Sequence, residues 1–138
     1  GVLTCALPIY KIASGGELAR FMLALKVNLA QSSSVATMIF DEVDAGVGGA
    51  TAQAVGERLA RLARDVQVLV VTHSPQVAAC GNNHFKVEKS TADNVTTTTV
   101  RELTKIEKSE EIARMLAGEV ITDAARAAAK VLMKEKSA

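Results

Sequence analysis

Two adjacent carboxylates, Asp41 and Glu42, directly follow a short apolar run and are the residues of this chain best suited to chemistry. An aspartate at the end of a strand can hold Mg²⁺, directly or through water, because Mg²⁺ prefers few carboxylates and keeps several waters. A neighbouring glutamate can then orient or deprotonate a water for in-line attack on a phosphate. The plainer alternative is a solvated loop start, since acidic residues commonly follow strands. The pair therefore indicates phosphate chemistry if other elements support it.

A second candidate, Ser14-Gly15-Gly16-Glu17, lies about twenty-five residues before the carboxylates. It fits the capping box, in which a serine caps a helix and a glutamate reaches back to the cap. A cap alone has no need of two glycines, since each costs roughly 1 kcal/mol against alanine inside a helix. A loop whose backbone must press against phosphate oxygens does need them, and a helix N-terminus adds N–H groups and a positive dipole end. We expect a helix cap and an anion seat at once.

A third candidate, His73, ends another apolar run about thirty residues after the carboxylates. It could donate a hydrogen bond to the terminal phosphate of a nucleotide or to the attacking water. The commoner alternative is a histidine at the edge of a core, bonded to a backbone carbonyl. Asp44 and the glycines after it could form a loop that reaches across an interface, or an ordinary turn before a helix. His84 has no comparable placement, and we expect it at the surface.

Apolar periodicity predicts the elements that must position these residues. Repeats at helical spacing indicate helices, and short apolar runs between turn signals suit strands that are buried on both faces. The expected helices lie at residues 14–30, 50–63, 74–81, 109–116 and 122–134. The expected strands lie at residues 35–40 and 66–71, with a hairpin or edge pair at 85–89 and 95–103 that is rich in threonine and valine.

The helix expected at residues 50–63 joins two buried strands, so these strands should form a parallel βαβ unit. The residues that this helix would turn inward are Ala54, Val55, Leu59 and Leu62. Ligands of parallel sheets bind beyond the carboxyl ends of the strands. The carboxylate pair and His73 both follow such an end, so we expect them to meet at one edge of the sheet.

Length and composition fit one domain with an aliphatic core. The chain has 138 residues, 49% hydrophobic and 3% aromatic, with a formal net charge of +1. That charge gives no case for strong attraction to nucleic acid or to a membrane surface. Cys5 and Cys80 lack a metal-ligand spacing and are expected as thiols in a reducing cytoplasm. No apolar run approaches the ~20 residues of a membrane span.

Residues 1–10 do not continue the pattern behind them, and we expect a non-native or disordered leader before a single domain at 11–138. No G-x-x-x-x-G-K-S/T phosphate loop occurs in the sequence. The chain thus lacks the lysine and the glycine cradle that grip the β- and γ-phosphates. Alone, it should bind ATP poorly.

The motifs together resemble the C-terminal part of the RecN family of DNA repair proteins, which are SMC-like members of the ABC ATPase superfamily. The resemblance runs from about Lys11 to Lys134. Residues 11–20 resemble the ABC signature, residues 40–49 the Walker B motif and D-loop, and residues 72–79 the switch-histidine segment. A signature that ends in glutamate differs from that of transporter ATPases, and the glycine-rich D-loop differs from that of chromosomal SMC proteins.

The resemblance implies an α/β fold, namely the C-terminal lobe of a P-loop NTPase-like head of the ABC/SMC type. Residues 11–138 would be the C-terminal half of that head, with a parallel βαβ core, an edge hairpin and flanking helices. ATP and Mg²⁺ would be the cofactors. Heads of this family dimerise with two ATP molecules between them, so the signature of one head would contact ATP held by the other.

By the same resemblance, each candidate residue has a role. Asp41 would bind the metal, and Glu42 and His73 would be catalytic within their own head. The residues that would contact the nucleotide are Ser14, Gly15, Gly16, Glu17 and Asp44. The partners would be a second head in a homodimer, the missing N-terminal lobe and, through the complete protein, DNA, with no membrane. The complete protein would hydrolyse ATP during double-strand-break repair and recombination in the bacterial cytoplasm, at the nucleoid.

Two alternatives stay open. One is a non-catalytic half-head that serves as an interaction module. The other is the head fragment of another SMC-type or ABC-type ATPase. In each case, the chain alone is expected to be inactive because it has no phosphate loop of its own.

Overall fold

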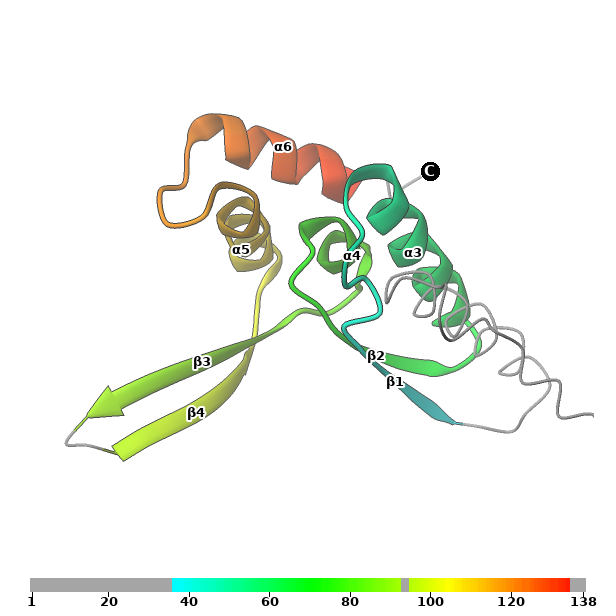
Figure 1. The fold of residues 1–138 in the computed structure, drawn as a ribbon, viewed down its shortest axis with the longest axis horizontal. Helices are drawn as coiled ribbons and strands as arrows, with labels where there is room; N and C mark the ends of the chain where they lie inside the picture. Colours follow the sequence, from blue (N-terminus) through cyan, green and yellow to red (C-terminus); the bar gives the residue numbers. More distant parts are fainter. Residues whose placement is uncertain (1–35, 93–94, 135–138) are drawn as a thin grey trace, which may run out of the picture.

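The computed structural model describes residues 36–92 and 95–134. In chain order these residues form β1 (Thr37–Asp41), α3 (Gly49–Leu62), β2 (Gln67–Val71), α4 (Pro75–Cys80), β3 (Phe85–Ala92), β4 (Val95–Glu102), α5 (Lys105–Ala117) and α6 (Asp123–Lys134). In Figure 1 the labelled helices gather on one side of two strand pairs, which splay apart below them. Three predictions lie outside the described residues: the leader at 1–10, the helix expected at 14–30 and the signature residues Ser14, Gly15, Gly16 and Glu17.

The parallel βαβ unit predicted from the sequence is confirmed. β1 and β2 pair in parallel, with Thr37 opposite Gln67 and Asp41 opposite Val71. Phe40 of β1 is completely buried in a core cluster that includes residues of α3. Because successive strand residues point to opposite faces, the residues on either side of Phe40 face away from this core.

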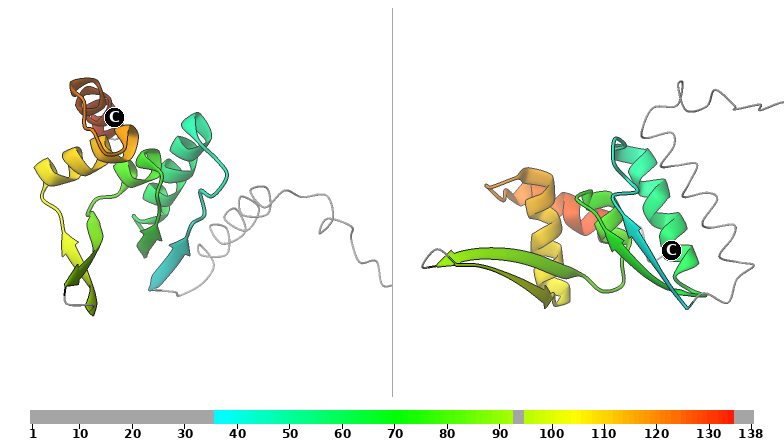
Figure 2. Two further views of the ribbon diagram at one scale, coloured as in Figure 1. Left: turned by 60° about the vertical axis from the view of Figure 1, so that its left-hand side comes forward. Right: turned by 60° about the horizontal axis from the view of Figure 1, so that its bottom comes forward.

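The other face of this sheet is exposed in the part of the chain that the structure describes, so the expectation of strands buried on both faces was wrong for that part. Ile39, Leu69 and Val71 are 65%, 45% and 57% exposed. No helix within residues 36–92 and 95–134 covers them, and Figure 2 shows α3 on one side of the strands. An apolar run indicates that both faces of a strand can be buried. It does not indicate how many faces the helices of residues 36–92 and 95–134 cover, which here is one.

α3 buries one stripe of its surface against the sheet and α4. The residues of this stripe are Ala52, Val55, Gly56, Leu59 and Leu62. The prediction of an inward Ala54 was wrong, since that residue is exposed. Buried residues three and four apart share one helix face, and Ala54 does not fall on that repeat.

The crossing of α3 and α4 depends on Gly56. A Cβ atom at this position would lie 2.7 Å from Cys80 Sγ and 3.2 Å from the Cα atom of Val77. Both distances are too short for ordinary contact, so the absent side chain allows the two helices to approach. α4 itself begins at Pro75 after Ser74 and ends before Gly81, as the sequence predicts.

The predicted hairpin is present and is longer than expected. β3 and β4 pair in antiparallel register from Phe85 opposite Glu102 to Ala92 opposite Val95. Figure 1 shows the hairpin projecting away from the helices, and most of its residues are exposed. At its base, Lys86 Nζ lies 3.2 Å from Glu111 Oε2 of α5.

His84, which was expected at the surface, is partly buried beside this base. Burial lowers the pKa of its imidazole, and the nearby positive charge of Lys108 lowers it further, against an opposing effect of Glu111. Its carbonyl oxygen accepts a hydrogen bond from Leu103 N at 2.8 Å, which extends the hairpin pairing.

α5 begins at Lys105, four residues earlier than the helix expected at 109–116. The reason is a capping box at Thr104. Thr104 N donates to Glu107 Oε2 at 2.8 Å, and Glu107 N donates to Thr104 Oγ1 at 3.3 Å. α5 and α6 then pack through a second core of Ala79, Ile112, Ala113, Ala125 and Ala129. None of the described helices has the length and hydrophobicity that crossing a membrane requires.

Candidate functional site

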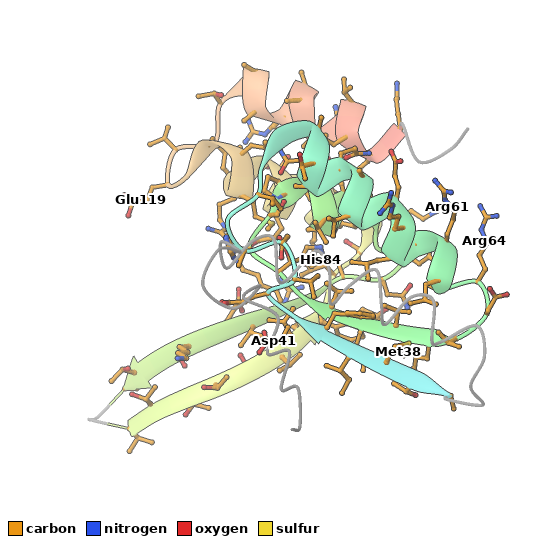
Figure 3. All side chains as sticks on the ribbon, turned by 45° about the vertical axis from the view of Figure 1, so that its right-hand side comes forward. Met38, Asp41, Arg61, Arg64, His84 and Glu119 are labelled. Carbon is orange, nitrogen blue, oxygen red and sulfur yellow. The ribbon has the colours of Figure 1, made fainter. Side chains whose placement is uncertain are left out.

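The carboxyl ends of β1 and β2 meet at one edge of the parallel sheet, which we call the carboxyl rim. It consists of Asp41, Glu42, Asp44, Thr72 and His73. Asp41 is opposite Val71 in the sheet, and Glu42 N donates to Val71 O at 3.0 Å, two residues before His73. Figure 3 shows Asp41 where β1 ends and the chain turns toward α3. The rim therefore brings together the strand-end residues that were predicted to act in one site.

Asp41 is exposed on the open face of the sheet. Within the described part of the chain, its carboxylate has no ion pair. No group of three metal-coordinating side chains occurs in that part either. A cation held by Asp41 would therefore take most of its ligands from water and from a bound phosphate. These are the ligands that Mg²⁺ prefers, so the donor set fits that ion.

Glu42 is exposed and has a φ of 47°, in the left-handed region that non-glycine residues seldom adopt. Its backbone is held from both sides: Glu42 N donates to Val71 O, and Ala45 N donates to Glu42 O at 3.0 Å. Strained backbones of this kind gather at functional sites, where the surrounding structure holds them in place. The conformation is a structural feature that the sequence did not predict.

Asp44 is 1% exposed, so its carboxylate lies inside the protein. Thr72 Oγ1 donates a hydrogen bond to Asp44 Oδ2 at 2.5 Å. Asp44 Oδ1 is also buried and has no hydrogen-bond partner among the described residues. In this conformation the Asp44 side chain faces Thr72, and the contact of Asp44 with a nucleotide stays a prediction.

The rest of the D-loop-like segment has conformations that explain its glycines. Gly46 and Gly49 have φ angles of 74° and 53°, which favour glycine. Val47 N donates to Asp44 O at 3.1 Å, which closes a turn. The segment is therefore a glycine-dependent turn that connects the carboxyl rim to the start of α3.

His73 is exposed at the rim. Among the described residues, its imidazole makes no hydrogen bond to a backbone carbonyl, which argues against the plainer interpretation of a core-edge histidine. The residues beside it are fixed, because Ser74 N donates to Thr72 Oγ1 at 2.9 Å and Ser74 Oγ donates to Gln76 Oε1 at the same distance. Within residues 36–92 and 95–134, the imidazole is thus exposed and next to hydrogen-bonded neighbours that hold its segment in place.

Sequence reasoning placed Thr72 in the segment of His73 but gave it no role of its own. Its hydroxyl accepts from Ser74 N and donates to Asp44, so it contacts both segments of the rim. The local signal was a hydroxyl residue directly before the strand-end histidine. No sequence pattern links it to an aspartate 28 residues earlier.

Comparison with known proteins finds relatives that are DNA repair proteins. No protein-family model matches the chain. The DNA repair protein RecN of Rickettsia felis is 50% identical over 125 residues, which cover 91% of this chain. RecN proteins of Streptomyces coelicolor and Mycobacterium leprae are each 52% identical, over 94% and 95% of this chain. The aligned part is 23% of each relative, so the chain spans about a quarter of their length.

A solved structure from work on the ATP-driven dimerisation and DNA-stimulated activation of SMC ATPases has a similar fold. It superimposes with a TM-score of 0.61 over 80% of this chain and 66% of that chain, at 20% identity. At that identity the likeness concerns the fold alone. It confirms the predicted fold class, an α/β fold of the SMC ATPase head type. Over more than nine-tenths of its length, the chain is thus related to the RecN DNA repair proteins.

Proposed function

We propose that this chain is the C-terminal part of an ATP-binding and ATP-hydrolysing protein of DNA double-strand-break repair and recombination. The observation that carries the proposal is the carboxyl rim, where Asp41, Glu42 and His73 follow two hydrogen-bonded parallel strands. Ligands of parallel sheets bind at this edge. Identity near 50% to proteins named for DNA repair gives the biological setting.

The rim residues divide the work of phosphate hydrolysis. Asp41 would hold Mg²⁺, which when bound offsets the negative charge of the phosphates. Glu42 would orient a water molecule and accept its proton, and His73 would donate a hydrogen bond to the terminal phosphate. Each group is exposed and reaches solvent at the rim. The signature residues Ser14, Gly15, Gly16 and Glu17 would contact the nucleotide of a second head through backbone N–H groups.

The complete protein would bring what this sequence lacks. It would provide an N-terminal lobe with the phosphate loop, pair with a second head around two ATP molecules and engage DNA in a bacterial cytoplasm at the nucleoid. The glycine-rich segment at 44–49 would lie at the head-to-head interface and contact the nucleotide, with Asp44 shaping it. The chain alone would be inactive because the phosphate loop is absent from its sequence.

A second candidate is a non-catalytic half-head that acts as an interaction module. The open sheet face of Ile39, Leu69 and Val71 favours it, because exposed apolar surfaces often mark interaction sites. This candidate predicts binding to a partner without any requirement for the carboxylate of Glu42.

Reconstitution separates the two candidates. The chain would be mixed with a separately produced polypeptide that comprises the remaining three quarters of a RecN relative, and ATP hydrolysis would be measured with Mg²⁺. We expect no turnover from the chain alone and turnover from the mixture, which Glu42→Gln abolishes. A mixture that binds tightly but hydrolyses no ATP would favour the interaction module.

A further inference from the structure

We propose that Thr72 and Asp44 are positioning residues that fix Glu42 and His73 relative to each other. The proposal rests on the function proposed above and deepens it. Neither residue needs to touch the nucleotide for this role. Thr72 directly precedes His73, and Asp44 follows Glu42 by two residues, so a bond between them links the segments that carry both groups.

The hydroxyl of Thr72 makes two directed contacts. It donates to Asp44 Oδ2 at 2.5 Å and accepts from Ser74 N at 2.9 Å. A hydroxyl has one donor and can accept as well, so both contacts use its normal capacity. The two bonds hold the backbone on either side of His73 and tie it to the segment after β1.

The backbone provides a second link between the same segments. Glu42 N donates to Val71 O at 3.0 Å, and Ala45 N donates to Glu42 O at 3.0 Å. The first bond ties the left-handed Glu42 to β2, and the second closes the turn that follows Glu42. The Thr72–Asp44 bond then ties that turn to the residue before His73. The Glu42–Val71 bond and the Thr72–Asp44 bond together restrain the position of Glu42 more than either bond alone would.

The burial of Asp44 argues that the bond serves more than stability. Its carboxylate is 1% exposed, and Oδ1 has no hydrogen-bond partner among the described residues. A buried polar atom without a partner lowers stability, and an apolar pair of similar shape would avoid that cost. The hydrogen bond between Thr72 and Asp44 is directional, so it holds the two loops in one relative arrangement. An apolar pair has no such directionality.

The test uses the full-length protein that contains this chain, with ATP turnover measured across ATP concentrations. Thr72→Val removes the hydroxyl and keeps the size of the side chain, while Thr72→Ser keeps the hydroxyl. Since small misplacements of reacting groups can cost as much as 100-fold, we expect Thr72→Val to lower kcat about 10- to 100-fold. KM should change little, and Thr72→Ser should restore most of the turnover.

Asp44→Ala supplies the second arm of the test. If the two side chains act through one bond, Asp44→Ala and the double variant with Thr72→Val should each lower kcat about as much as Thr72→Val alone. The melting temperature of every variant would be measured in parallel, so that loss of folded protein is separated from loss of kcat.

Three results would overturn the proposal: a Thr72→Val protein with normal kcat, effects of the two single variants that multiply, or a Thr72→Ser protein as slow as Thr72→Val. In each of these, an active wild-type protein would leave the proposed function standing. A folded wild-type protein without any ATP turnover would instead overturn the proposed function, and the positioning role with it.

Discussion

The backbone amide of Glu42 donates a hydrogen bond to the carbonyl oxygen of Val71, and the two atoms lie 3.0 Å apart. This bond extends the parallel pairing of β1 and β2 by one residue beyond Asp41. It joins the segment that carries the carboxylates to the strand that leads into His73. The two candidate catalytic segments are therefore parts of one hydrogen-bonded unit.

Replacing Glu42 by glycine should stabilise the fold relative to alanine. Glu42 has a φ of 47°, and this conformation costs about 1 kcal/mol or more for a residue with a Cβ atom. Glycine adopts it without that strain, so Glu42→Gly should have a higher free energy of unfolding than Glu42→Ala. Urea denaturation of both variants measures the difference in free energy of unfolding. A glycine variant that is less stable than the alanine variant would contradict backbone strain at Glu42.

Gly56→Ala should destabilise the crossing of α3 and α4. The new methyl group would lie 2.7 Å from Cys80 Sγ and 3.2 Å from the backbone of Val77, and overpacking of this kind costs about 1–3 kcal/mol. Denaturant unfolding would measure the loss. In a Cys80→Ala background the cost should shrink, because the nearest atom is then gone. An equal cost in both backgrounds would show that the sulfur is not the obstacle.

The cap of α5 should give the protein a pH-dependent stability in acid. Hydrogen bonds from the backbone and side chain of Thr104, with a further one from Arg101, lower the pKa of Glu107 from 4.5 to about 2. Because the pKa is lower in the folded protein, the stabilisation is complete above pH 4.5 and is lost as the pH falls toward 2.

Glu107→Gln removes this titration, so melting temperatures measured from pH 6 to pH 2 should fall less steeply for that variant. Glu119→Gln, at an exposed residue in the loop between α5 and α6, is the matched control and should follow the wild-type curve (Figure 3). Equal slopes for the wild-type protein and Glu107→Gln would contradict a lowered pKa of Glu107.

Much of the fold and of the rim was predictable because local patterns encode it. Two apolar runs joined by a helical stripe predict a parallel pair, and strand ends then converge by geometry. Other features depend on contacts that no local pattern shows. The bond between Thr72 and Asp44 joins residues 28 apart, and the left-handed φ of Glu42 occurs at a residue type that rarely adopts it.

Two corrections have different physical origins. The early start of α5 follows from the capping box at Thr104 and Glu107, a T-x-x-E pattern that the sequence contains and that the prediction of a helix at 109–116 did not use. The exposed face of the β1–β2 sheet could not be predicted from the sequence. An apolar strand residue looks the same in a sequence whether or not residues 36–134 provide a helix that covers it.

The most direct test of the central claim is ATP turnover by the complete protein that carries Glu42→Gln. A general base contributes about 10²- to 10⁴-fold to a rate, so we expect turnover to fall by at least 100-fold. ATP binding should persist, and the protein should accumulate as an ATP-bound dimer. Glu119→Gln, in the loop between α5 and α6 and well apart from Asp41 in Figure 3, should turn over ATP normally. Unchanged turnover in Glu42→Gln would contradict the assignment of the carboxyl rim as the site of hydrolysis.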